Sequence, residues 1–239
     1  MRLLFLLVAL FSIVSKATPY PDIWWKPIVD SNVPSWEILP QSAARDKNEV
    51  ILSKRNELGI LSNFAATPFT MNGTRYASLE GLWQSMKYPE SANDMRLMID
   101  TKWPMKRFEV AALTAFEALK AGKEAEKIML ANQVNWVSFN GFKIKYKDSD
   151  SDAYYDVIEA ATRAKIDQNP KVKQILLATG DLILKPDHHE DKDGTRAWKY
   201  YEIYMKLRTD LKSKSNKKLY SDDWFASFSK KYKLTKIQE

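Results

Sequence analysis

A change of hydrophobic pattern near residue 78 is the feature that most constrains the fold of this 239-residue chain. Upstream, residues 50–52, 61–69 and 74–77 favour strands, and Asn72-Gly73 between the last two favours a type I′ hairpin turn. Downstream, apolar residues recur at helical spacing. The pattern predicts an α+β fold, namely a predominantly helical single domain with a small antiparallel sheet or hairpin.

The helical part divides at residues that favour helix starts. Ser91 and Ser151 are suitable N-caps, and Pro104 and Pro170 suit the first position of a helix. Residues 136–146 are aromatic and irregular, which is typical of a short strand or a loop, and residues 187–195 form a polar loop. Helices are therefore expected over residues 78–88, from about 91, 104–120, 123–132, 152–168, 171–178 and 196–211.

The first 17 residues have the pattern of a secretory signal peptide. Met1-Arg2 is a short positive start, residues 3–14 are apolar apart from Ser12, and residues 15–17 resemble a cleavage site. The alternative is a membrane anchor, but the apolar run is shorter than the roughly 20 residues that cross a bilayer. We expect a secreted or periplasmic protein. The chain has no cysteine, so its stability must come from its core.

Two extensions flank the expected domain over residues 49–211. Residues 18–48 contain five prolines and three tryptophans, which oppose long helices and favour a segment lying across the surface. Residues 212–239 are basic: from residue 206 to the end there are ten Lys/Arg and four Asp/Glu. This end, with its embedded aromatic residues, could contact a polyanion, an anionic lipid or an acidic partner. The alternative is a solvated helical face.

One face of the helix expected over residues 78–88 has an unusual composition. Glu80, Trp83, Gln84 and Lys87 recur at i, i+3, i+4 and i+7 and therefore share that face. An acid, an indole, an amide and a cation together suit a polar ligand with a ring. The alternative is a surface stripe in which Glu80 and Lys87 meet solvent and Trp83 is partly buried.

These residues belong to a longer motif. The chain resembles the NADAR (YbiA-like) family of N-glycosidases, without a gap, over residues 61–88. The resemblance continues, in order, to about residue 211. The matching segments are Ser62-Asn63-Phe64, Pro68-Phe69, Gly73, residues 78–88, Pro104-Met105, Ala111-Ala112, Ala164-Lys165-Ile166, Asn169, residues 175–180 and residues 205–208.

The resemblance implies an enzyme that hydrolyses the N-glycosidic bond of an ADP-ribosylated or other ribosylated nitrogen compound, without a cofactor. Together with the signal-peptide pattern of residues 1–17, it leads us to expect an exported enzyme. Such a cleavage passes through an oxocarbenium-like state that a carboxylate stabilises. Matched residue by residue, Glu80 is the family's catalytic glutamate. The residues expected to bind substrate are Asn63, Phe64, Trp83, Gln84 and Lys87.

The chain departs from the family pattern at two places. Gly81 replaces a histidine, and the late loop lacks a Trp-Gly pair, with Trp198 and Tyr201 where Asn and Gly are expected. Asp191 falls at the acidic position of this loop and is the second catalytic candidate. These departures leave two alternatives open: a catalytically weakened module that binds ADP-ribose or nucleic acid, and an interaction protein that kept only the fold.

The only two histidines, His188 and His189, also lie in this loop. They could suggest a metal site. Adjacent histidines point apart in regular backbone, however, and the chain has no H-E-x-x-H spacing. We expect a polar loop and no metal.

Overall fold

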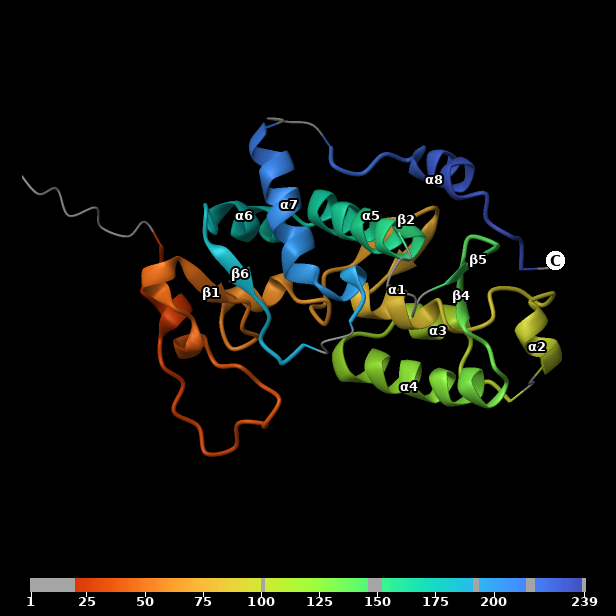
Figure 1. Cartoon of the computed structure of the whole chain (residues 1–239), viewed down its shortest axis with the longest axis horizontal. Coiled ribbons are helices and arrows are strands. Elements are labelled where there is room, and N and C mark those ends of the chain that lie inside the picture. Colours follow the sequence, from red (N-terminus) through yellow and green to blue (C-terminus); the bar gives the residue numbers. More distant parts are fainter. Residues whose placement is uncertain (1–19, 100–101, 146–151, 191–193, 214–217, 238–239) are drawn as a thin grey trace, which may run out of the picture.

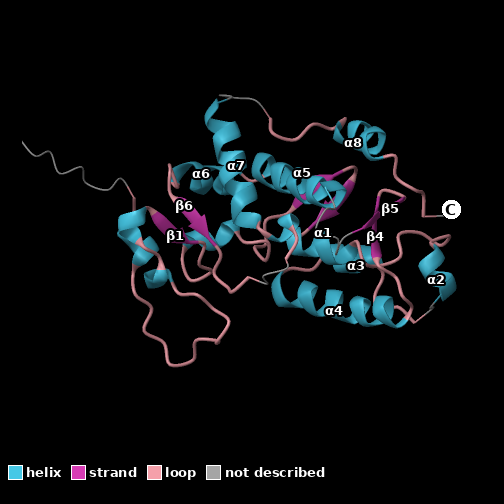
Figure 2. Cartoon of the chain, viewed as in Figure 1, coloured by secondary structure: helices cyan, strands magenta, loops and turns pink. Residues whose placement is uncertain are grey.

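A computed structural model describes residues 20–99, 102–145, 152–190, 194–213 and 218–237. The expected signal peptide, Ser151 and Asp191 lie outside these ranges. Figures 1 and 2 show a mostly helical chain. The strands in these ranges form three two-stranded sheets, which confirms the α+β prediction. The helices are α1 Leu79–Ser85, α2 Met95–Ile99, α3 Arg107–Ala111, α4 Ala115–Ala131, α5 Asp152–Gln168, α6 Pro170–Ala178, α7 Tyr200–Ser213 and α8 Trp224–Tyr232. The strands are β1 Glu49–Ile51, β2 Phe69–Met71, β3 Thr74–Tyr76, β4 Trp136–Phe139, β5 Phe142–Lys145 and β6 Ile183–Lys185.

The hairpin β2–β3 turns as predicted. Asn72 and Gly73 both have positive φ, 48° and 75°, as a type I′ turn requires. The segment β4–β5 is a second antiparallel hairpin. Helices α5 and α6 also have their predicted positions. Among the described residues, no helix has the length and apolar character of a membrane span.

Two predictions about elements are wrong. The region 61–69 is not a strand: Leu61 ends a short 3-10 helix, Glu57–Leu61, residues 62–68 form a loop, and only Phe69 belongs to a strand, β2. Asn56 caps the 3-10 helix, and the Ser62 hydroxyl accepts from the Phe64 amide. Pro104 does not begin a helix, since α3 starts only at Arg107 and Ala115, at φ 49°, separates α3 from α4. The structure also contains a parallel pair that the sequence analysis did not predict, β1 with β6.

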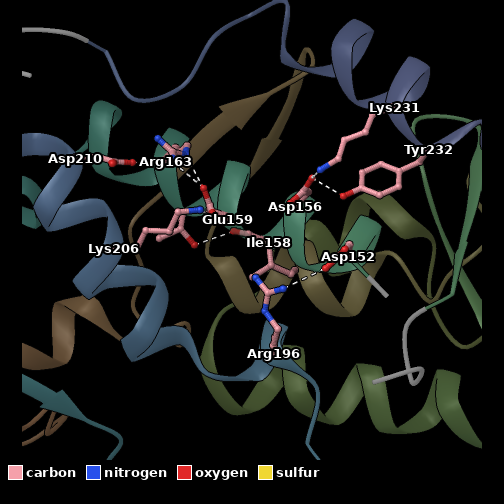
Figure 3. Close-up of polar contacts among 11 residues, drawn as sticks. Asp152, Asp156, Ile158, Glu159, Arg163, Arg196, Lys206, Asp210, Lys231 and Tyr232 are labelled. Carbon is pink, nitrogen blue, oxygen red and sulfur yellow. Dashed lines mark hydrogen bonds and ion pairs between the residues drawn. The ribbon is translucent and has the colours of Figure 1, made fainter. Parts of the chain in front are cut away.

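Helix α5 is the centre of the core and packs against α1, α6, α7 and α8. Its apolar face, including Tyr154, Val157, Ile158 and Ala161, is buried. Its other face carries charged side chains at helical spacing that pair with later segments (Figure 3). The pairs are Asp152 with Arg196, Asp156 with Lys231 and Tyr232, Glu159 with Arg163 and Lys206, and Arg163 with Asp210.

The N-terminal extension is attached to the domain by its aromatic residues. Trp24 and Trp25 are buried, and their indole N–H groups donate to the Glu57 carboxylate and the Glu49 carbonyl, both at 2.8 Å. From Tyr20, where the description begins, the helices of this extension are all short 3-10 helices, consistent with its proline content. At the other end of the chain, Phe228 of α8 is buried and stacks with Trp224, with ring centroids 4.7 Å apart.

Candidate functional site

The predicted site residues surround one cavity of about 610 Å³. Its walls come from α1, the loop after the 3-10 helix Glu57–Leu61, the first turns of α4, the late loop and the N-terminal extension. All the sequence-predicted residues within the described ranges line it, namely Asn63, Phe64, Glu80, Trp83, Gln84 and Lys87. Asp191, the remaining candidate, lies outside the described residues.

Helix α1 is fixed at both ends, which positions its cavity face. At its start, the Ser78 hydroxyl accepts from the Gly81 amide at 2.9 Å, and the Glu80 amide donates to the Asn63 carbonyl at 3.0 Å. Beyond its end, the buried Arg96 guanidinium donates to the carbonyls of Met86 and Lys87 at 3.1 and 2.9 Å. The positions of Glu80 and Lys87 are therefore set by contacts outside the helix.

Glu80 is a buried carboxyl group at the cavity wall, with 6% of its surface exposed. Burial raises its pKa above the ordinary value, although the hydrogen bond from Gln84 and the charge of Lys87 oppose the shift. Gln84 Nε2 donates to Glu80 Oε1 at 2.7 Å. Lys87 Nζ lies 3.4 Å from Glu126 Oε2 on α4. The result is an oriented carboxyl group whose protonation is sensitive to its neighbours.

The side chain of Gln84 lies against Gly122 on α4. A Cβ atom added to Gly122 would be 1.6 Å from Gln84 Oε1 and 2.2 Å from its Cδ. The absence of a side chain at position 122 therefore gives Gln84 the space in which it reaches Glu80.

Gly81, where the family has a histidine, lies on a different side of α1. A Cβ atom there would be 2.6 Å from the Leu113 carbonyl oxygen and 3.0 Å from that of Ala111. Neither the glycine nor these contacts belong to the cavity lining. In this chain, position 81 is part of the packing between α1 and α3, and a side chain there would require backbone movement.

The late loop contributes a charged group that the sequence did not single out. Asp187 is fully buried and accepts from Lys54 Nζ, and its Oδ1 lies 3.2 Å from His188 Nδ1. Burial raises the pKa of Asp187, but the bonds to His188 and Lys54 outweigh burial, and the net pKa is lowered. The His188 ring stacks on Tyr200, with centroids 6.1 Å apart. Within the described residues, no group of three or more potential metal ligands occurs.

A buried lysine supports the loop that carries Asn63. Lys165 of α5 donates from Nζ to the Ser62 carbonyl at 2.9 Å. Burial lowers its pKa to about 7. Lys165 falls within the family-like Ala164-Lys165-Ile166 segment, but no local pattern connects it with the loop 103 residues away.

Several cavity residues were missed because they come from segments remote in sequence. Two of them, Trp198 and Tyr200, occupy the late region where the chain departs from the family pattern. The cation Lys54 follows β1, and Trp36 belongs to the N-terminal extension. The missed lining residues are Trp36, Lys54, Phe116, Leu119, Lys123, His188, His189, Trp198 and Tyr200. These residues show that the late region, α4, the segment after β1 and the N-terminal extension all contribute to the cavity wall.

Comparison with known proteins gives one structural likeness. No protein-family model matches the chain, and no curated protein does. A solved structure that matches is the NMR structure of the E. coli protein YbiA. The two chains are 20% identical, with a TM-score of 0.45, over 70% of this chain and 87% of YbiA. The function is therefore argued from the cavity itself.

Proposed function

We propose that this chain is an exported, NADAR-like N-glycosidase that hydrolyses the bond between a ribose carbon and nitrogen in an ADP-ribosylated or other ribosylated nitrogen compound. The observation that carries the proposal is the position of Glu80. Its buried carboxyl group lines a cavity with Asn63, Trp83 and Lys87, the residues of the resembling motif.

The reaction needs a carboxylate next to the sugar. As the C–N bond breaks, its electron pair leaves with the nitrogen, and positive charge develops on the ribose ring. Ionised Glu80 stabilises this charge and accepts a proton from the attacking water, whose oxygen bonds to the ribose carbon. The proton then passes to the departing nitrogen.

We also propose Asp191 as a second acid. Asp191→Asn should lower turnover, and unchanged turnover would show that Asp191 is not part of the site.

The other cavity groups suit a ribose phosphate. Lys54, Lys87 and Lys123 supply positive charge for phosphate oxygens. Asn63 Oδ1 is buried and has no hydrogen-bond partner among the described residues, so a ribose hydroxyl would satisfy it. Trp83 offers an indole for contact with a base.

The decisive variant is Glu80→Gln, which keeps the shape and removes the charge. We expect base release from ribosylated compounds to fall by about two or more orders of magnitude. Folding should be unchanged by circular dichroism, and ADP-ribose binding should remain measurable by calorimetry. The matched control is Glu117→Gln, an exposed carboxylate of α4 that does not line the cavity.

Two outcomes would contradict the proposal. Equal turnover of wild type and Glu80→Gln would show that the carboxylate is not catalytic. Binding of ADP-ribose by both proteins without base release by either would favour the alternative, a weakened binding module on the same fold.

Export and polyanion contact are proposed on sequence and surface grounds. N-terminal sequencing of protein from its host should begin at Thr18 or within a few residues of it; an intact Met1 on cytoplasmic protein would contradict export.

In the basic extension, Lys230, Lys233 and Lys236 are exposed while Phe228 packs inward. The charge of these lysines, and not ring stacking, should therefore give salt-dependent binding to polyanions. If the full chain shows no binding at low salt, this proposal is wrong.

A further inference from the structure

The N-terminal extension reaches the cavity, although it lies outside the family resemblance. Residues 26–39, here called the strap, form a loop that approaches the first turn of α4 (Figure 1). Trp36 of the strap lines the cavity together with Phe64 and Phe116. Its ring centroid lies 6.2 Å from that of Phe116, which in turn lies 5.2 Å from that of Phe64.

The strap is held on both sides of this contact. Arg55 binds the Glu37 carboxylate through Nε and Nη2 at 2.8 and 2.7 Å, and Asp30 through Nη1 at 2.8 Å. Glu37 also forms a β-bridge with His188, and the Ile38 amide donates to the Asp187 carbonyl at 2.8 Å. Trp36 is therefore fixed relative to both the late loop and the body of the domain.

Two of the three rings are unusually exposed for their size. Trp36 has 41% of its surface exposed and Phe116 has 58%. Phe116 follows Ala115, whose positive φ of 49° is strained for a residue with a side chain. The planes within each contacting pair cross at 65° and 84°, so these rings do not stack on one another. Their arrangement leaves ring surface available to a further planar group.

Positive charge lies next to these rings. Lys54 Nζ is 5.8 Å from the Trp36 ring centroid and 5.3 Å from that of Phe64. Its bond to buried Asp187 keeps it there. A ligand that combines a flat aromatic group with phosphate would meet the rings and the cation at the same end of the cavity.

We infer that Trp36, Phe64 and Phe116 form a stacking subsite for the flat aromatic group of a ribose-phosphate ligand, and that the strap, through Trp36, makes the site select for ligands with such a group. The inference rests on the proposed function for the identity of the sugar phosphate. Trp36 acts here in specificity, while Glu80 acts in bond cleavage.

The test is equilibrium binding to the Glu80→Gln protein, which separates recognition from turnover. The probes are ADP-ribose, which carries adenine, and ribose 5-phosphate, which carries no ring system of this kind. Adding Trp36→Ala should weaken ADP-ribose binding about ten-fold or more and change ribose 5-phosphate binding by less than about two-fold. Trp36→Phe should retain most of the affinity. Val29→Ala, a change at a fully exposed strap residue, should alter neither value.

The outcomes distinguish this inference from the proposed function. If ADP-ribose binds and Trp36→Ala leaves its affinity unchanged, the inference is wrong and the proposed function is unaffected. Equal weakening of both probes would show that Trp36 only supports the structure, which also overturns the inference. If neither probe binds to Glu80→Gln or to wild type, the sugar-phosphate assignment fails and the inference fails with it.

Discussion

Replacing Gly122 by alanine tests the packing that orients Glu80. The added Cβ would lie 1.6 Å from Gln84 Oε1 and within 2.8 Å of Gln84 Cγ, so the whole amide side chain must move. Gln84 is itself buried and donates to Glu80 at 2.7 Å. Because its surroundings are filled, we expect this hydrogen bond to be lost.

Two opposing effects set how much Gly122→Ala changes the free energy of unfolding. Alanine is more favourable than glycine inside a helix by about 1 kcal/mol. Loss of a buried hydrogen bond to a charged group costs about 1.5–3 kcal/mol. Gly122→Ala should therefore lower the free energy of unfolding by about 0.5–2 kcal/mol. In a Gln84→Ala background the obstructing side chain is absent, and the same change should instead stabilise the protein by about 1 kcal/mol.

The assay is a double-mutant cycle measured by urea unfolding of the four proteins. A coupling of about 1.5–3 kcal/mol and a reversal of sign between backgrounds are the expected results. Gly122→Ala should also reduce base release, because the Gln84 bond lowers the pKa of Glu80 and orients its carboxyl group. If Gly122→Ala has the same effect on stability in both backgrounds, Gln84 does not occupy this space and the reasoning is refuted.

Two further predictions concern pH. The charge of Lys87 lowers the pKa of Glu80, so Lys87→Met should raise that pKa. Because activity is lost as pH falls through the pKa of Glu80, the acid limb of the kcat/KM profile should move to higher pH. An unmoved limb would show that Glu80 is not the titrating group. Burial lowers the pKa of Lys165 to about 7 from its ordinary 10.5. Between these two pKa values Lys165 carries a proton in the unfolded chain but not in the folded chain. Its contribution to the free energy of unfolding therefore rises by roughly 1.4 kcal/mol for each pH unit. Urea unfolding of Lys165→Met at pH 7, 8 and 9 should show a smaller rise than wild type, and an equal rise would contradict the assignment.

Local sequence patterns predicted the features that depend on neighbouring residues. The Asn72-Gly73 turn follows from the conformations those residues tolerate, and α5 follows from apolar spacing. The shared face of Glu80 and Gln84 follows from helical geometry alone. Each of these requires only a few consecutive residues.

The missed features depend on contacts between distant segments. The pairing of β1 with β6 involves only three residues per strand, which is too short to give a distinctive pattern. Pro104 is an acceptable first helical residue, but the helix starts at Arg107, where the Lys106 amide donates to Glu109 Oε2 at 2.6 Å. Lys54 and Trp36 reach the cavity through tertiary contacts that their own sequence neighbourhoods do not encode.

The positions of the residues in the structure show what the departures from the family motif do to the cavity. The glycine at position 81 removes no group from the cavity, because the site that a side chain would occupy is filled by the Leu113 carbonyl. The altered late region still supplies Trp198 and Tyr200 to the wall, and the strap adds Trp36. The differences from the motif at these positions therefore leave a cavity that Glu80, Asn63 and Lys87 still line. Glu80 is held in place by α1, Gln84 and Gly122, and it faces a cavity whose wall includes aromatic rings from the late region and the strap.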